Sequence, residues 1–402
     1  MNDQRFTHSP FDEILLSADD RANLVTIADA LVRANVREYR HHVQRGKHVD
    51  LTRWKRVCSA GTTATYLERS ASPSKHHQPR TKSLPASLMV GPLPGTLEEN
   101  MFGLVSPTLD DMRLKASYLH DVSAAAVLAT IVAPSVENPF RSVVVKWMEI
   151  DIPGASLGLV RNRDYVYLES CGIAELDTGE RLGYHLLHSV SFPQAHELPS
   201  RVRGNMSFCG VFCQEGPDRT DCRGTGIMDP GGDGARVMAI MAMVQATMAG
   251  LKYSYCGRMK KLVQVLSQRP EERVKERRAL VAQPVCVTCS KPIKTGKLKL
   301  SVGKSSGTCK LCDGLLCSTC KIAKKLSFLR PAEQPHLVQR KVTFCVQCLV
   351  EATSGDTLEA ARQQFVDKNQ RGQRSASDCP RACDLSSRSD GTMSSSSNSQ
   401  GS

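Results

Sequence analysis

Apolar residues recur every three to four positions between Arg21 and His41. This spacing puts them on one face of a helix. The apolar positions are Leu24, Ile27, Ala28, Leu31, Val32, Val36 and Tyr39. The pattern therefore predicts an amphipathic helix over residues 21–41.

The pattern changes to one of strands between Phe140 and Gly226. Successive side chains of a strand face opposite sides of a sheet, so a two-residue period indicates a half-buried strand. The candidate strands are the β-branched run 141–150, the alternating run 163–169 and the longer run 181–192; Val202, Met206, Phe208 and Phe212 share one parity in the next run. Earlier, the run 62–67 is also β-prone. Residues 87–100 read as strand, turn and helix, with Thr96 as N-cap.

Helical spacing returns after the turn Asp229-Pro-Gly-Gly. The apolar stripe is Val237, Ile240, Met241, Val244, Met248 and Leu251, in a helix expected to reach about Leu266. A stripe of this kind is more often core than ligand contact, although flexible methionines also suit a lid over a variable ligand. A helix, successive strands and a long terminal helix predict an α+β architecture.

Short motifs in these elements resemble the START lipid-transfer domain over about residues 20–266. They are Arg163-Asp-Tyr-Val-Tyr-Leu, Gly226-Ile-Met-Asp-Pro-Gly-Gly and the Met-rich terminal helix. The resemblance implies a helix-grip fold, in which a curved antiparallel sheet surrounds a long C-terminal helix and encloses an apolar cavity. It implies a hydrophobic, lipid-like ligand, contacted from the helix by Val237, Met241, Val244 and Met248.

Eight cysteines form four Cys-x-x-Cys pairs between residues 286 and 348. They are Cys286, Cys289, Cys309, Cys312, Cys317, Cys320, Cys345 and Cys348. Four thiolates at about 2.3 Å make a tetrahedral zinc site, so four pairs predict two zinc ions. Disulfides are the competing interpretation. The scattered Cys58, Cys171, Cys209, Cys213, Cys222 and Cys256 are interpreted as ordinary buried thiols.

Composition and charge indicate the cellular compartment and the kind of partner that these sites would have. The sequence has no run of about 20 apolar residues, and its first residues are polar. We therefore expect a cytoplasmic chain with reduced thiols. The net charge of +13 is concentrated in residues 258–341, where 20 Lys/Arg and 5 Asp/Glu give +15. Such a patch suits an anionic surface, unless its lysines are simply solvated; sparse aromatics in the cysteine block argue against nucleic acid.

The all-cysteine order C-x2-C-x4-C-x2-C at the centre of the block distinguishes among cross-brace zinc modules. A RING finger has a histidine between its second and third pairs, and a PHD finger has one at the fifth ligand position, where this chain has Cys317. The block resembles the FYVE zinc finger over about residues 282–351. START domains followed by such fingers are familiar in oomycete proteins. The resemblance implies interleaved ligands, with Cys286, Cys289, Cys317 and Cys320 on one ion and Cys309, Cys312, Cys345 and Cys348 on the other.

FYVE fingers commonly bind phosphatidylinositol 3-phosphate on endosomes, but this sequence departs from their lipid motifs. Gly307 and Thr308 stand where paired histidines would precede the third cysteine, and Thr343 replaces an arginine. The remaining candidate head-group contacts are Lys304, Lys310, Arg340 and Lys341. The sequence therefore implies a FYVE-like zinc scaffold more strongly than it implies specific binding of phosphatidylinositol 3-phosphate.

The predicted organisation is a START-like domain (1–267), a charged linker (268–281), a FYVE-like zinc finger (282–351) and a largely disordered tail (352–402). No nucleophile with an evident base, phosphate-binding glycine loop or telling carboxylate pair occurs, so we expect a non-enzymatic, lipid-linked adaptor that associates peripherally with endosomal membranes. The alternative is a protein-interaction platform without a lipid ligand. A ubiquitin ligase is disfavoured because the RING histidine is missing.

Overall fold

The computed structural model describes residues 9–69, 84–120, 122–152, 155–158, 160–231, 236–268, 285–293, 307–330 and 336–377. Met1–Phe365 form one compact unit and Val366–Ser402 a second. Residues 70–83 and nearly all of the expected charged linker lie outside the described residues, as do residues 378–402.

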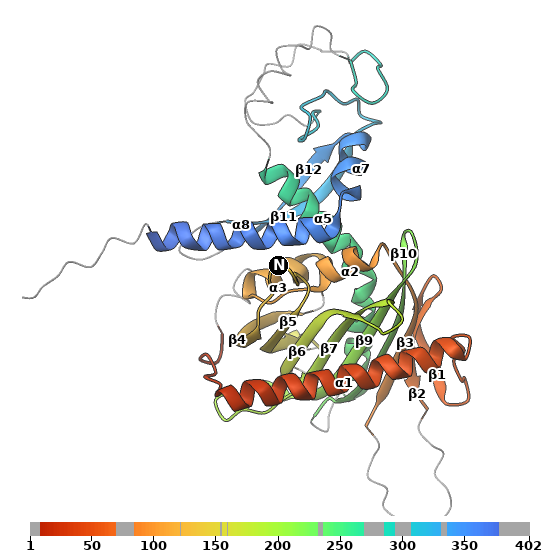
Figure 1. The fold of residues 1–402 in the computed structure, drawn as a ribbon, viewed down its shortest axis with the longest axis vertical. Coiled ribbons are helices and arrows are strands. Elements are labelled where there is room, and N and C mark those ends of the chain that lie inside the picture. The colour runs from red at the N-terminus through yellow and green to blue at the C-terminus, as the bar shows by residue number, and fades with distance from the viewer. Residues whose placement is uncertain are drawn as a thin grey trace, which may run out of the picture. The chain divides into compact units, whose positions relative to one another are not determined.

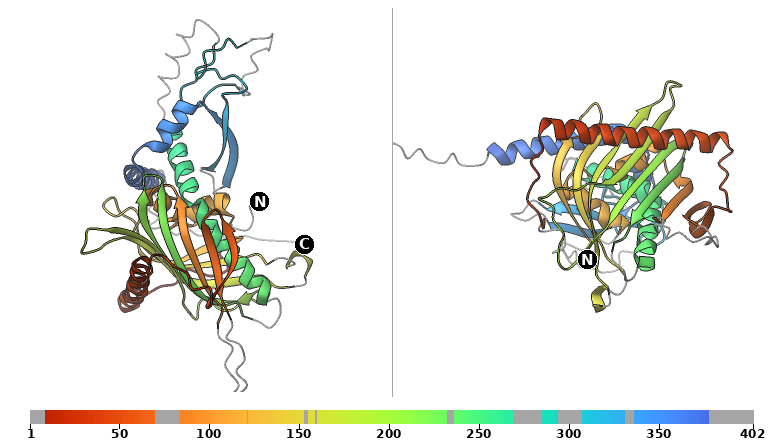
Figure 2. Two further views of the ribbon diagram at one scale, coloured as in Figure 1. Left: turned by 90° about the vertical axis from the view of Figure 1, so that its right-hand side faces the viewer. Right: turned by 90° about the horizontal axis from the view of Figure 1, so that it is seen from below.

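The N-terminal helix α1 spans Ala18–Gln44 and confirms the predicted helix, with three more residues at each end. Ser17 caps it: its side chain accepts from the Asp20 N–H, and the Asp20 carboxylate accepts from the Ser17 N–H. Its buried residues are Leu24, Ala28, Val32, Val36 and Tyr39. This face packs on the outer side of a large sheet, across which α1 lies (Figure 2, right).

The described residues form a ten-stranded sheet with the order β1-β2-β3-β10-β9-β7-β6-β5-β4, and the short β8 pairs with β6. Its strands are β1 (Trp54–Ala60), β2 (Thr63–Glu68), β3 (Ala86–Pro94), β4 (Ala124–Val132), β5 (Ser142–Ile150), β6 (Arg163–Glu175), β7 (Arg181–Ser189), β8 (Val202–Arg203), β9 (Asn205–Gly216) and β10 (Arg219–Asp229). Apart from the parallel β6–β8 pair, neighbouring strands are antiparallel. The sheet curves in Figure 1.

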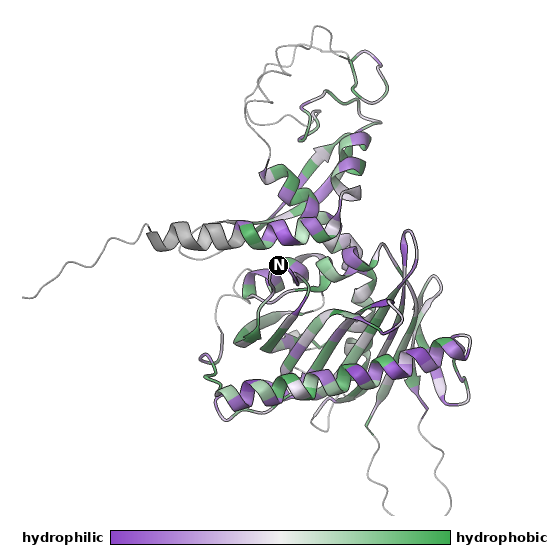
Figure 3. Ribbon diagram, in the orientation of Figure 1, coloured by the Kyte–Doolittle hydropathy of each residue, from purple (hydrophilic) through white to green (hydrophobic). Residues whose placement is uncertain are grey.

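Strand β5 is buried at all nine positions because both faces of the sheet are covered. Val143, Val145 and Trp147 pack in the cluster that includes the buried face of α1. Met148 and Ile150 point to the opposite face of the sheet, the inner one, and pack there with residues of helix α4 (Arg236–Met248). Figure 3 shows the hydrophobic colouring of these strands beside the mixed colouring of α1. A strand enclosed on both faces reads as a nearly continuous apolar run.

The C-terminal helix of the domain is not the single helix that the sequence predicted. It consists of α4 (Arg236–Met248), a 3-10 segment η3 (Ala249–Lys252) and α5 (Tyr253–Ser267). The change of helix type falls beside the buried Gly250. In Figure 2 (left), this helical segment runs on the opposite side of the sheet from α1.

Two short helices precede β4 and pack against α5. They are α2 (Leu97–Leu104) and α3 (Leu109–Leu119). Thr96 caps α2 as predicted, accepting from the Glu99 N–H. A Cβ on Gly103 would lie 1.8 Å from the Tyr253 carbonyl oxygen, and one on Gly257 2.3 Å from that of Glu99. The crossing of α2 and α5 therefore requires glycine on both helices.

The cysteine-rich region contains a hairpin of β11 (Ile322–Arg330) and β12 (His336–Phe344), followed by α7 (Val346–Ser354) and α8 (Thr357–Ser377). The structure is thus helical over much of 352–377, where the sequence predicted a largely disordered tail.

The hairpin packs on α3 and α5. Leu326 and Phe344 share one apolar cluster with Met259 and Leu262 of α5. The Ser327 N–H donates to the Tyr118 hydroxyl at 2.8 Å, and Gln339 Nε2 donates to the Ser117 carbonyl at 3.0 Å. The cysteine-rich region therefore packs directly on two helices of the preceding domain.

Candidate functional site

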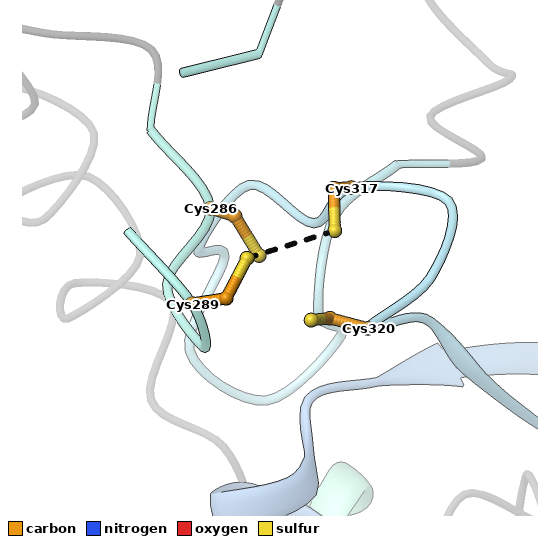
Figure 4. Close-up of side chains that lie close together, drawn as sticks. All are labelled: Cys286, Cys289, Cys317 and Cys320. Carbon is orange, nitrogen blue, oxygen red and sulfur yellow. Dashed lines mark hydrogen bonds between the residues drawn. The ribbon is translucent and has the colours of Figure 1, made fainter. Parts of the chain in front are cut away.

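The eight paired cysteines meet in two groups of four. One is Cys286, Cys289, Cys317 and Cys320; the other is Cys309, Cys312, Cys345 and Cys348. Within each group the sulfurs lie within 4.8 Å of one another, and Figure 4 shows the first set of thiols converging. The first group joins the first and third Cys-x-x-Cys pairs of the sequence, and the second group joins the second and fourth pairs. This is the interleaved pairing that the FYVE resemblance implied.

The first two pairs sit in matching turns. Ser290 follows Cys289 with φ 56°, and Asp313 follows Cys312 with φ 56°, both left-handed conformations that non-glycine residues adopt uncommonly. The Ser290 N–H donates to the Cys286 carbonyl at 2.8 Å, and the Asp313 N–H donates to the Cys309 carbonyl at 2.9 Å. These tight turns bring both thiols of each pair to one side.

The donor sets fit zinc. Tetrahedral Zn–S bonds of about 2.3 Å separate sulfurs by about 3.8 Å. Cys289 and Cys317 lie 3.8 Å apart at Sγ, and Cys312 and Cys345 lie 4.0 Å apart. Hydrogen bonding from the backbone of Cys317 lowers the pKa of the Cys286 thiol to about 6, which favours the thiolate form that binds metal.

The fourth pair lies at a helix N-terminus. Cys345 is the N-cap of α7, and its sulfur accepts from the Cys348 N–H at 3.4 Å. Both four-thiol groups therefore have the chemistry and the spacing to hold one metal ion each.

A separate cavity lies inside the large sheet, between its inner face and the helices α3, α4 and α5. Its volume is about 130 Å³, and the hollow including its open mouth reaches about 1010 Å³. Most lining side chains are apolar, among them Met89, Leu93, Met148, Met206, Phe208 and Phe212. An enclosed apolar space with a few polar groups is the usual form of a small-molecule site.

The helix contributes other residues to this cavity than those predicted. Ala246, Thr247, Gly250 and Tyr253 line it. Of the predicted positions, Val237 is 72% exposed and Val244 is buried away from the lining. The predicted Met241 is likewise outside the lining, and Met248 contacts the Thr65 hydroxyl through its sulfur at 3.1 Å. Met248 nevertheless packs in the cluster of the cavity-lining Met89, Leu93 and Phe212, so helical spacing alone did not indicate which residues of this segment line the cavity.

A buried polar cluster stands at one wall of the cavity. Lys146 Nζ pairs with the Glu169 carboxylate and donates to the Ser106 carbonyl at 2.7 Å. His185 Nε2 lies 2.9 Å from Glu169 Oε1. Glu169, His185 and Lys115 line the cavity. Burial alone would raise the pKa of Glu169, but Lys146 and His185 outweigh it and hold this pKa well below its usual range.

His185, Cys209 and Cys222 of the cavity lining are neutral at pH 7. Burial lowers the pKa of His185, with Glu169 opposing it. Burial raises the pKa of the Cys209 thiol to about 12, and it also raises that of Cys222. These cysteines behave as the buried thiols that the sequence predicted, and neither is an activated nucleophile.

The candidate head-group residues lie on the cysteine-rich region. Lys310, Arg340 and Lys341 line one groove of about 550 Å³. Apolar side chains complete it: Leu266, Phe328, Val338 and Val342. Lys304 lies outside the described residues. The groove therefore brings three of the four predicted cations together beside an apolar floor.

Neither a scan against protein-family models nor a search of curated proteins found a match for this sequence. Similar solved structures include human StAR-related lipid transfer protein 5, with 13% identity and a TM-score of 0.40 over 58% of this chain and 98% of that one. A STAR-related lipid transfer protein fragment from Xanthomonas axonopodis has 16% identity and a TM-score of 0.34, covering 50% and 96%. The Zhui aromatase/cyclase from Streptomyces sp. R1128 has 13% identity and a TM-score of 0.25, covering 42% and 91%.

The fold class rests on the chain's own topology. A curved antiparallel sheet grips a C-terminal helical segment and encloses an apolar cavity, which is a START-like, α+β helix-grip arrangement. A small cross-brace with two four-cysteine groups follows it. None of the helices in the described ranges combines the length and apolarity needed to span a bilayer.

The sequence analysis missed the Lys146–Glu169 pair. Lys146 interrupts an otherwise apolar run, Val143-Val-Val-Lys-Trp-Met. A lone charge in a run buried on both faces requires a buried partner. That interruption was the available signal, although the identity of the partner depends on strand pairing.

Proposed function

We propose that this protein is a non-enzymatic, lipid-linked adaptor. In this proposal the internal cavity binds one hydrophobic ligand, and a FYVE-like module holding two zinc ions directs the chain to an anionic membrane surface such as that of endosomes. The observation that carries the proposal is the enclosed apolar cavity beneath the broken C-terminal helix.

The volume of the cavity limits the size of the ligand that it can hold. A closed space near 150 Å³ holds a molecule the size of benzene, so about 130 Å³ accommodates only one part of a lipid. The rest of the ligand would occupy the open mouth of the cavity. Exposed Val237 and Met238 at the start of α4 are consistent with a helix that is displaced when a longer ligand enters.

The ligand is tested by extracting lipids from the purified full-length chain and identifying them by mass spectrometry. A cavity-filling variant, Gly224→Leu, should lose the extracted species. A Cβ on Gly224 would lie 3.8 Å from the Met89 Cβ, so the added side chain has room to occupy the cavity. Gly216→Leu is the matched control, since a Cβ there meets nothing within 4 Å.

Lipid that co-purifies with the wild type and the Gly216→Leu control but not with Gly224→Leu supports the proposal. If no lipid co-purifies or exchanges into the wild-type chain, the cavity has no lipid ligand. That outcome would favour the alternative, in which the zinc module binds only partner proteins.

The membrane part depends on the groove of Lys310, Arg340 and Lys341. Each basic residue near an anionic leaflet adds about 1 kcal/mol. We expect sedimentation with phosphatidylserine vesicles to fall with added salt and in the double variant Arg340→Gln/Lys341→Gln. Salt-resistant binding to phosphatidylinositol 3-phosphate alone would instead show a specific head-group site.

A further inference from the structure

A groove lies on the outer face of the sheet, between the C-terminal half of α1 and strands β3, β9 and β10. Its volume of about 550 Å³ is that of an ordinary small-molecule site. Strand alternation places Arg223 in the groove, whereas Cys222 and Gly224 on either side of it line the internal cavity. Ser87, Cys209 and Thr225 line both, so the groove is a second site that adjoins the cavity across the sheet.

Arg223 provides the strongest indication of a ligand. Only 14% of its side chain is exposed, and its Nη2 lies 3.9 Å from Glu38 Oε2, whose side chain is 62% exposed. Across the described ranges its guanidinium donates no hydrogen bond to the protein. Burial lowers the pKa of Arg223, which reflects the cost of keeping its charge there. Five N–H donors thus lack a protein acceptor at the wall of a groove.

Further donors surround this guanidinium. His42, Arg45 and His48 line the same groove. Burial and the charge of Arg223 lower the pKa of His42, which places its ring close to the guanidinium. Arg45 adds positive charge, and the two imidazole rings add hydrogen-bond donors, on the α1 side of Arg223.

The acidic residues of the groove do not neutralise this potential. Glu38 is mostly solvent-exposed. Asp50 instead accepts from the N–H and hydroxyl of Thr52, at 2.8 and 2.6 Å. Arg53, the remaining cation of the groove, is itself paired with Glu68 at 2.8 Å. The positive charge around Arg223 is therefore left for a ligand.

Apolar side chains also line the groove, among them Leu31, Trp54 and Leu88. A forked guanidinium with neighbouring donors suits a phosphate, which offers several acceptor oxygens. We propose that this groove binds a small phosphate ester, whose phosphate accepts from Arg223 and whose organic part contacts these apolar side chains.

The test measures binding to the full-length chain by calorimetry, with inorganic phosphate, glycerol 3-phosphate and phosphatidic acid vesicles as probes. Arg223→Gln should weaken phosphate-ester binding at least about tenfold, as expected for loss of a charge-assisted hydrogen bond. Arg56→Gln, which removes an exposed arginine of β1, should leave it unchanged. Arg223→Lys should give an intermediate affinity because it keeps the charge and loses the fork.

Thermal unfolding distinguishes this role from a structural one. Because Arg223 makes only one long ion pair in the described part of the chain, with the exposed Glu38, the Tm of Arg223→Gln should stay equal to or above that of the wild type. Binding of glycerol 3-phosphate that depends on Arg223 identifies a soluble ester as the source, whereas Arg223-dependent binding of phosphatidic acid vesicles alone identifies a lipid head group. Absence of binding to all three probes at millimolar concentration, equal affinity in Arg223→Gln, or a lowered Tm in that variant would overturn the proposal.

Discussion

Glu169 is the residue whose environment depends most on the complete fold. Its carboxylate is 1% exposed and interacts with Lys146 from β5 and His185 from β7. Removing one member of a buried ion pair leaves an uncompensated charge, which costs about 3–5 kcal/mol. Lys146, Glu169 and His185 therefore join the neighbouring strands β5, β6 and β7 at the cavity wall.

The folded-state pKa of Glu169 is lowered, so its contribution to stability is present above the unfolded value of about 4.3 and is lost as the pH falls below it. We expect Glu169→Gln to lower the free energy of unfolding at pH 7 by about 3–5 kcal/mol. Its stability should also fall less steeply than that of the wild type between about pH 5 and 2. Urea unfolding across this range measures both effects.

Glu175→Gln is the matched control, because Glu175 lies at the exposed end of the same strand. It should reproduce the wild-type stability and its pH dependence. Equal stability of Glu169→Gln and the wild type at pH 7 would show that the ion pair contributes nothing net to folding.

At the scale of elements, the sequence predicted those features that depend on a few neighbouring residues. The α1 periodicity, the Thr96 cap and the Cys-x-x-Cys pairs each act over a few residues, and each is confirmed. Properties that depend on distant packing were missed. The break at η3 coincides with the close passage of α5 over Gly103, which lies about 150 residues earlier in the chain.

Lys261 joins two elements whose relation the sequence did not indicate. From α5, its ammonium donates to the carbonyls of Thr353 (2.6 Å) and Gly355, and to the Thr357 hydroxyl at 3.1 Å. It thereby satisfies carbonyl groups at the C-terminal end of α7, which lack helical partners. Lys261→Met should destabilise this junction by about 1–3 kcal/mol.

Amide hydrogen exchange over residues 349–358 measures this effect, since loss of the cap should speed exchange there while β6 stays protected. Lys252→Met, at an exposed position of η3, is the control and should leave exchange unchanged. Unaltered protection in Lys261→Met would show that the packing of α7 holds the junction without the lysine.

At the scale of the compact unit 1–365, the metal centre and the cavity share a helical segment. The η3–α5 segment lines the cavity through Gly250 and Tyr253, and α5 packs on the hairpin through Met259 and Leu262. A small cross-brace depends on its metal to fold. Loss of metal should therefore loosen the hairpin and expose one side of α5.

Cys317→Ser tests this coupling. It removes one of the four thiols of the first site, so we expect the zinc content to fall from two ions to one and the hairpin to lose protection. Because the same helical segment then loses packing, exchange at residues 250–256 should quicken, and lipid should leave the cavity faster. Cys58→Ser, which changes a cysteine of β1 outside both groups, should keep two zinc ions and wild-type exchange. Two zinc ions in Cys317→Ser would refute the ligand assignment, whereas one ion with unchanged exchange at 250–256 would show that the metal centre and the cavity are independent.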